Sequence, residues 1–274
     1  VSIVIPFKDK PDLLKKCVES ILYKSTYKNF EIIGVSNNST EEETFREMER
    51  LASLDSRVRF YEYNVPFNFS KINNHAVKHY AQGDHIILLN NDIEIISEDW
   101  IECMLEFSQR EDVGAVGAKL YYPNDTIQHA GVIIGLGGVA GHSHKHYHRD
   151  APGYFYRPHL VQNVSAVTGA CLMVKKSIFE EVNGLNETDL TVAFNDVDFC
   201  LRIRKRGYLN VYTPYAEAYH HESLSRGPED DPIKIARFES EIRFMKENHK
   251  SILAEGDPYY NINLTLDFED FSLR

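Results

Sequence analysis

The chain has 274 residues, of which 43% are apolar and 12% aromatic, a globular composition that excludes the disordered and fibrous classes. Its formal net charge is −11 and it contains no Lys/Arg-rich run, which excludes a nucleic-acid partner. An acidic protein that binds an anionic nucleotide needs a metal ion or a few local cations to offset the repulsion between them.

Processing and targeting signals are sparse. No apolar run approaches the roughly 20 residues that span a bilayer, so we expect no transmembrane segment. The four cysteines show no zinc-type spacing and need no disulfide, which favours a reducing cytoplasm. The chain lacks an initiator Met and opens in a strand-like run, so we expect a domain of a longer, multidomain protein.

Strands and helices alternate along the first hundred residues. Apolar runs predict strands over residues 1–6, 30–35, 58–63 and 85–89. Helices are expected between them: one with Pro11 near its start, one with a capping box at Ser39 or Thr40, and one capped by Ser70 and ended by Gly83. This alternation predicts an α/β fold with a mainly parallel sheet flanked by helices, whose ligands bind at the carboxyl ends of the strands.

The second half is less regular. Strands are expected over residues 113–122, 128–134, 166–174, 210–212 and 217–220, and helices over 176–182, 197–206 and 234–248. The last helix reads as an amphipathic cover, followed by an acidic, aromatic tail. With no clear linker, the first half (about 1–100), which looks nucleotide-binding, and the second half (about 101–227) should share one domain, on which residues 228–274 pack.

Three polar segments carry the candidate chemistry. Asn90-Asn91-Asp92 directly follows a buried strand, where a carboxylate is costly unless it is paired, for example with a divalent cation on a diphosphate; a turn is the alternative. Asp196 opens a helix whose dipole keeps a carboxylate ionised, as a general base for a sugar hydroxyl must be; a helix N-cap is the alternative.

The third segment is residues 220–227, HHESLSRG, after a late strand. A histidine there could complete a metal site, and Ser and Arg could bind phosphate oxygens, although a surface loop would explain the polarity equally well. The turn at Gly169 would let the backbone approach the donor sugar closely.

Alternating histidines at 142, 144, 146 and 148 would share one face of a strand. This spacing could bind zinc, but no Cys or carboxylate is spaced to match. We expect instead a loop over the site that helps to shape the acceptor pocket together with Tyr154, Phe155 and Tyr156.

Eight segments together resemble family 2 glycosyltransferases of the GT-A (Rossmann-like) fold, in particular the bacterial polysaccharide and rhamnosyltransferase-like branch. The resemblance extends over about residues 1–227 and implies a nucleotide-sugar-binding half (about 1–100) fused to an acceptor-binding half (about 101–227). The segments are VSIVIP, VSNNST, FNFSKINN, LLNND, SAVTGACLMV, NGLNE, NDVDFCLRIRKRGY and HHESLSRG.

The resemblance implies a role for each matching residue. Asp196 would be the general base, and Asp92 with His220 or His221 would bind Mn²⁺ or Mg²⁺. The donor would be contacted by Pro6, Asn37, Asn38, Lys71, Asn74, Asn91, Gly169, Ser223, Ser225 and Arg226. The sequence departs from the family pattern at Ser36, which replaces an acidic residue, and at Asn90, which leaves one carboxylate for the metal.

The function implied is inverting transfer of a sugar from a nucleotide-diphosphate donor, a UDP- or dTDP-sugar, to an acceptor hydroxyl in surface polysaccharide or glycoconjugate synthesis. The acceptor would be a glycan, lipid-linked or protein-linked. The protein is expected in the cytoplasm, where its acceptor would hold it at the inner face of the membrane. The alternative is a catalytically silent domain that binds a sugar nucleotide or glycan. A nucleotidyltransferase would carry a Gly-rich basic loop after the first strand, which residues 7–10 lack.

Overall fold

The computed structural model describes residues 1–222 and 231–274. The strands are β1 (Ser2–Phe7), β2 (Glu31–Ser36), β3 (Val58–Glu62), β4 (His85–Leu89), β5 (Ile93–Ile95), β6 (Val113–Tyr121), β7 (Ile127–His129), β8 (Val132–Ile134), β9 (Ala140–His142), β10 (Gln162–Val164), β11 (Cys171–Lys175) and β12 (Leu209–His220). The helices are α1 (Pro11–Lys24), α2 (Glu42–Leu54), α3 (Phe69–His79), α4 (Trp100–Ser108), α5 (Lys176–Glu181), α6 (Asn195–Lys205), α7 (Pro232–Asn248) and α8 (Lys250–Glu255), with 3₁₀ segments η1 (Leu136–Gly138) and η2 (Tyr154–His159).

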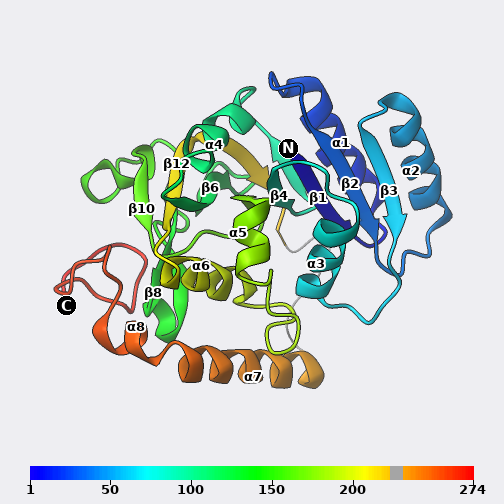
Figure 1. Ribbon diagram of the computed structural model, residues 1–274. Coiled ribbons are helices and arrows are strands. Elements are labelled where there is room, and N and C mark those ends of the chain that lie inside the picture. Colours follow the sequence, from blue (N-terminus) through cyan, green and yellow to red (C-terminus); the bar gives the residue numbers. More distant parts are fainter. Residues whose placement is uncertain (223–230) are drawn as a thin grey trace.

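One large sheet organises the molecule (Figure 1). Its strands lie in the order β10-β12-β6-β11-β4-β1-β2-β3, with β5 on β12 and β7 on β6, while β8 and β9 form a separate hairpin. Strands β1 to β4 are parallel, and β12 is parallel to β6, but β11 runs antiparallel between β4 and β6. The prediction of a mainly parallel sheet flanked by helices is confirmed.

The reversal of β11 brings its first residue to the carboxyl end of β4. Cys171 pairs with Leu89, and the N–H of Asn90 donates to the carbonyl of Ala170 at 3.0 Å. The segment that leads into β11 therefore reaches the edge at which β4 ends, and both can contribute side chains or backbone to one site.

Helices cover both faces of the sheet, so its strands are apolar on both sides. On β1, Ile3 and Ile5 pack with the helices α1 and α4, whereas Val4 packs with α3, α5 and α6 on the other face. Helix α4 is not among the helices predicted above. Its buried Trp100, Ile101 and Met104 nevertheless have helical spacing.

Two predicted helix starts are wrong. Asn68, not Ser70, caps α3 by accepting from the N–H of Lys71; Ser70 lies within the helix and donates to the carbonyl of Leu190. Helix α2 has no side-chain cap of its own. Instead Oδ1 of Asp9, from the loop after β1, accepts the N–H groups that precede the helix, at 2.8 and 2.9 Å.

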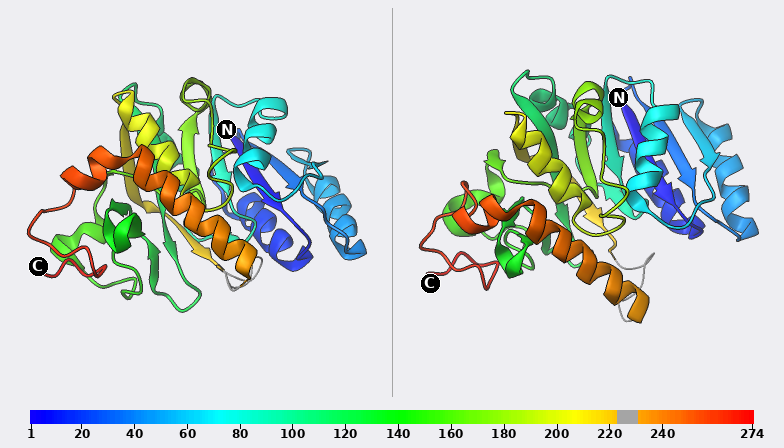
Figure 2. Two further views of the ribbon diagram at one scale, coloured as in Figure 1. Left: turned by 90° about the horizontal axis from the view of Figure 1, so that it is seen from below. Right: turned by 60° about the horizontal axis from the view of Figure 1, so that its bottom comes forward.

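Helix α7 runs along the side of the molecule that carries α6 and leads through α8 into the C-terminal tail, at the end of the molecule opposite α2 (Figures 1 and 2). Glu241 of α7 is fully buried and accepts the N–H of Val192 at 2.8 Å. No helix in the described part of the chain is long and apolar enough to cross a membrane.

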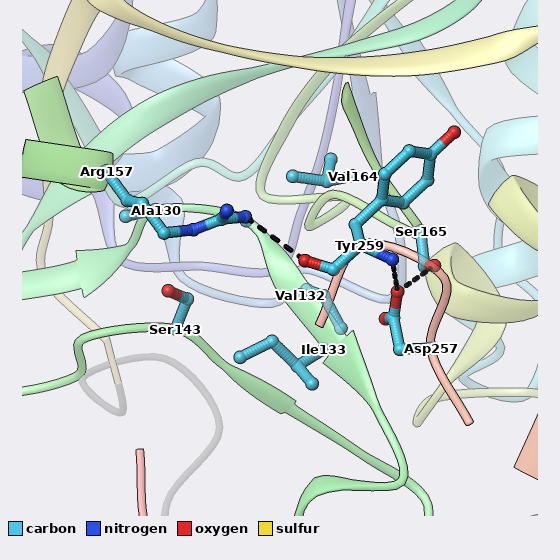
Figure 3. A pocket seen from close by; sticks show the side chains of 10 residues that line it. Ala130, Val132, Ile133, Ser143, Arg157, Val164, Ser165, Asp257 and Tyr259 are labelled. Atoms are coloured by element: carbon cyan, nitrogen blue, oxygen red, sulfur yellow. Dashed lines mark hydrogen bonds between the residues drawn. The ribbon is translucent and has the colours of Figure 1, made fainter. Parts of the chain in front are cut away.

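The tail is anchored beside β8 and β10 through Asp257 (Figure 3). Its Oδ2 accepts the N–H of Ile134 at 2.8 Å, and its Oδ1 accepts the hydroxyl of Ser165 at 2.7 Å and the N–H of Tyr259 at 2.9 Å. Arg157 donates to the carbonyl of Tyr259 across a cavity of about 10 Å³. A space of that size holds at most about one water molecule, so this region is a structural anchor.

Candidate active site

Two larger cavities meet at the carboxyl end of β4. The first, of about 280 Å³, is lined by Pro6, Phe7, Lys8, Asn37, Phe67, Phe69, Ile72, Asn90, Asn91, Asp92, Lys234 and Arg237. The second, of about 480 Å³, is lined on its polar side by Asn90, Gln128, His142, Lys145, Thr168, Asn195, Asp196, His220 and Glu222. Phe69 and Asn90 line both, so the cavities share a border.

Asp92 and His220 lie at this border because strand pairing places them there. Strand β5 begins directly after Asp92 and pairs antiparallel with the end of β12, so that Ile93 lies opposite His220. As a result Nε2 of His220 lies 3.2 Å from Oδ1 of Asp92 and 3.2 Å from Nδ2 of Asn90. Both the imidazole and the carboxylate are buried.

The border fits a divalent cation in part. Burial works to raise the pKa of Asp92, but the hydrogen bond and charge of His220 outweigh it and hold this pKa below the usual value. Oδ1 of Asp92 and Nδ1 of His220 are buried, and beyond the 3.2 Å approach of Nε2 of His220 to Oδ1, neither atom has a hydrogen-bond partner among the described residues. Carboxylate and imidazole together are a donor set that Mn²⁺ accepts, yet no described group of three His, Cys, Asp or Glu side chains could hold a metal alone. An ion bound there would need ligands besides these two side chains.

His221 points to a different carboxylate. Its Nε2 lies 3.0 Å from Oε2 of Glu94, while its N–H donates to the carbonyl of Asp92. Successive residues of a strand face opposite sides of the sheet, so only one of the two histidines can face Asp92. The structure brings His220 to Asp92.

Of the predicted donor residues that the structure describes, three line the first cavity, Gly169 lines the second, and three line neither. Pro6, Asn37 and Asn91 line the first cavity, and Nδ2 of Asn37 donates to the carbonyls of Tyr63 and Val65 at 2.9 and 2.8 Å. Three further predicted donor residues, Asn38, Lys71 and Asn74, line neither cavity. Asn38 and Lys71 are exposed, and Asn74 bonds to the backbone of Leu185 instead.

Asp196 lies in the second cavity, at the start of α6. Its Oδ2 accepts the N–H of Gly169 at 2.8 Å and its Oδ1 accepts the N–H of Val197 at 2.8 Å. The carboxylate is half-buried and faces the cavity. A Cβ atom at Gly169 would lie 3.3 Å from Cβ of Asp196, so a glycine allows the closest approach of this turn to the carboxylate. The residue at the N-cap position is Phe194, which makes no side-chain cap.

His129 contacts the turn at Thr168 and Gly169 from the core of the protein. It is fully buried, and burial lowers its pKa to about 3, so its ring is neutral. Nδ1 bonds to the carbonyl of Ala118 at 2.8 Å and Nε2 accepts the N–H of Thr168 at 3.2 Å. The residue next to Thr168 is Gly169, so His129 holds the turn that contacts Asp196.

The histidines at 142–148 do not form one cluster. His142 lines the second cavity, whereas His144 is buried and stacks on Phe271 of the tail, and His146 stacks on Tyr122. The expected contribution of Tyr154, Phe155 and Tyr156 to this cavity is not observed, because none of them lines it.

Helix α7 contributes three side chains that the sequence did not predict at the site. Lys234 and Arg237 line the first cavity, and Phe238 lines the second. The apolar spacing of α7 predicted a helix that covers the core. It did not indicate that Lys234 and Arg237 would line a cavity. Ser223, Ser225 and Arg226 lie outside the described residues.

The chain is similar to known proteins in sequence and in fold. A family profile described as "Glycosyl transferase family 2" matches residues 2–182. The chain is 52% identical over 273 residues to "Uncharacterized protein y4gI" of Sinorhizobium fredii, covering 100% of this chain and 30% of that protein. It is 38% identical over 279 residues to "O-antigen biosynthesis protein RfbC" of Myxococcus xanthus, covering 100% of this chain and 21% of that protein. The chain thus spans less than a third of the length of these two relatives.

Among solved structures, the mannosyltransferase PcManGT of Pyrobaculum calidifontis, in complex with GDP-Man and Mn²⁺, superposes with a TM-score of 0.62 at 16% identity. The match covers 88% of this chain and 64% of that one. At this identity the likeness concerns the fold, which is that of GT-A enzymes.

Proposed function

The chain belongs to glycosyl transferase family 2, and we propose that it transfers a sugar, with inversion, from a nucleotide-diphosphate donor to an acceptor hydroxyl. The observation that carries this proposal is the border between the two cavities. Asp92 and His220 lie at it, and Asp196 lies in the second cavity beyond it. A donor in the first cavity and an acceptor in the second would present their reacting atoms to each other there.

The first cavity offers what a nucleotide-diphosphate needs. Asn37 is held by two backbone carbonyls in the wall, so its amide is fixed before the donor arrives. Lys234 and Arg237 supply positive charge at the same cavity in a chain of net charge −11. Bound at Asp92 and His220, Mn²⁺ or Mg²⁺ would supply charge neutralisation for the diphosphate leaving group. PcManGT is solved with such a pair of ligands, GDP-Man and Mn²⁺.

Asp196 is proposed as the general base. One of its oxygens takes the proton of the acceptor hydroxyl as that oxygen bonds to the anomeric carbon. The bond from the anomeric carbon to the diphosphate breaks in the same step, and the nucleoside diphosphate leaves with the electron pair. A single in-line displacement inverts the anomeric centre. The N–H groups of Gly169 and Val197 donate to the two carboxylate oxygens of Asp196 and fix their position before the reaction.

The substrates are proposed by class. A UDP- or dTDP-sugar is the donor, and a glycan, lipid-linked or protein-linked, is the acceptor. The reaction belongs to surface polysaccharide or glycoconjugate synthesis, a proposal that the name of the relative RfbC, an O-antigen biosynthesis protein, supports. A lipid-linked acceptor would hold the enzyme at the cytoplasmic face of a membrane. Because α7 lines both cavities, we propose that residues 228–274 complete the transferase unit of residues 1–227.

The test is release of nucleoside diphosphate from a panel of UDP-, dTDP- and GDP-sugars, with Mn²⁺ or Mg²⁺ and a set of methyl glycosides as acceptors. Wild type, Asp196→Asn and Asp92→Asn are compared, and the anomeric configuration of the product is read by NMR. We expect metal-dependent transfer from one donor with inversion, reduced at least 10²-fold by Asp196→Asn. Donor binding without turnover, unchanged by Asp196→Asn, would favour a catalytically silent sugar-nucleotide-binding domain.

A further inference from the structure

His142 occupies the wall of the second cavity that the β8–β9 hairpin forms. It is the last residue of β9, and it lines the same cavity as Asp196 and Gly169. Nothing in the proposed mechanism uses it. Its ring nevertheless has a defined orientation, since Nδ1 lies 2.7 Å from the carbonyl oxygen of Gln128.

This contact fixes the position of the ring proton. A carbonyl oxygen only accepts hydrogen bonds, so Nδ1 of His142 must carry the proton that it donates to Gln128. Burial lowers the pKa of His142, which keeps the ring neutral at physiological pH. A neutral imidazole carries one N–H, and Nε2 is therefore a hydrogen-bond acceptor.

A second histidine holds the ring in place. His129 lies against His142 in an edge-to-face arrangement, with centroids 5.3 Å apart and planes at 77°. Both nitrogens of His129 are engaged, by the carbonyl of Ala118 and the N–H of Thr168. His142 therefore rests on a neighbour that cannot easily turn.

Nε2 of His142 receives no hydrogen bond from the residues that the structure describes, although its ring faces a cavity of about 480 Å³. A fixed acceptor atom of this kind is matched by a donor on the ligand. Saccharides offer hydroxyl donors next to one another on the ring. While one hydroxyl gives its proton to Asp196, a neighbouring hydroxyl can donate to the histidine.

We propose that His142 is an acceptor-binding residue whose Nε2 accepts a hydrogen bond from a second hydroxyl of the acceptor saccharide. The inference rests on the proposed function and adds a substrate class to it. The acceptor carries a free hydroxyl besides the one that is glycosylated. A simple alcohol, or a saccharide deoxygenated at that position, should therefore be a poor acceptor.

Two amide variants separate the two ring nitrogens. In His142→Asn the short amide can still donate to the carbonyl of Gln128 but presents no acceptor at the place of Nε2. In His142→Gln the longer amide can place its oxygen there. His146→Asn is the matched control, because His146 is exposed and lies on Tyr122 outside the cavity.

The measurement is steady-state transfer to the methyl glycoside that wild type glycosylates fastest, together with donor hydrolysis without acceptor. We expect His142→Asn to raise the acceptor KM about tenfold, with donor KM and donor hydrolysis unchanged. His142→Gln should recover most of the loss, and His146→Asn should match wild type. On the mono-deoxy glycoside that wild type uses least well, His142→Asn should cause no further loss.

Three results would overturn the inference. An unchanged acceptor KM in His142→Asn would show that Nε2 binds nothing, and an equal defect in His142→Gln would assign the role to ring packing on His129. Failure of wild type both to hydrolyse donor and to glycosylate any methyl glycoside would instead overturn the proposed function, and the inference with it.

Discussion

Nε2 of His249 lies 2.8 Å from Oδ1 of Asp198, and both side chains are buried. Asp198 lies two residues beyond Asp196 on α6, and its Oδ2 accepts Nε of Arg202 at 2.7 Å. Burial works to raise the pKa of Asp198, but these partners outweigh it and hold the pKa below its usual value. The junction of α7 and α8 is thereby joined to the helix that carries the candidate base.

Replacing His249 by Ala should destabilise the fold by about 3 kcal/mol, because a buried carboxylate oxygen of Asp198 loses its hydrogen-bond partner. Urea denaturation measures the change. Lys250→Ala, at the exposed neighbouring position, should stay within about 0.5 kcal/mol of wild type. A loss of less than about 1 kcal/mol in His249→Ala would show that water or another group replaces the imidazole.

Acid should destabilise the protein well above the pH at which its carboxylates titrate. Burial lowers the pKa of His129 and of His144 to about 3, against about 6.5 in the unfolded chain. Between these values the unfolded state binds the protons and the folded state does not. Each histidine then lowers the free energy of unfolding by about 1.4 kcal/mol per pH unit as the pH falls below 6.5. Above pH 6.5 neither histidine lowers it.

His144→Gln isolates one of these contributions. Nε2 of His144 accepts the N–H of Tyr154, and the amide oxygen of Gln can take that place. Denaturation curves from pH 6.5 to 4.5 should show a slope shallower by about 1.4 kcal/mol per pH unit than in wild type. An unchanged slope would mean that His144 is protonated in the folded state.

Asp257→Ala should cost about 3 kcal/mol of unfolding free energy, because three donors in the anchor of the tail lose their acceptor. Figure 3 shows two of these hydrogen bonds, from Ser165 and Tyr259. Asp257→Asn keeps one oxygen and should cost less. The exposed Glu269 of the same tail provides the control, and its replacement by Ala should be near neutral. Equal stability of wild type and Asp257→Ala in urea would refute the anchor.

Gly169→Ala tests the contact between the turn and Asp196. The added methyl group would lie 3.3 Å from Cβ of Asp196, so the carboxylate must move by a few tenths of an ångström. We expect kcat to fall about tenfold, since misplacement of a catalytic group is costly. Calorimetric affinity for the nucleoside diphosphate should not change, because Gly169 does not line the first cavity. A loss of affinity without loss of kcat would contradict this assignment.

The fold of the first hundred residues was predictable because its signals are local. Each parallel strand there is a short apolar run followed by a helix, and Asp92 stands where such a run ends. Asp196 was predicted for the same reason, since it opens a helix. The family resemblance added the order of the segments, and the family and the fold are confirmed, whereas the residue roles stay predictions.

What the sequence did not reveal depends on partners far along the chain. The pairing of β12 with β5 decides which of His220 and His221 faces Asp92, and no local pattern encodes that register. The cap on α2 comes from Asp9, about 30 residues earlier. The predicted strands at 210–212 and 217–220 are one strand, β12, with irregular pairing between Tyr212 and Glu217.

Because β11 runs antiparallel to β4, the candidate site combines two separate stretches of the sequence. The first cavity is built mainly from residues before 93, and the polar wall of the second mainly from residues after 127, and they join where Ala170 meets Asn90. Under the proposed function, donor specificity and acceptor specificity should therefore be separable by recombination. A chimera that carries residues 127–145 of a relative should change its acceptor while keeping its donor.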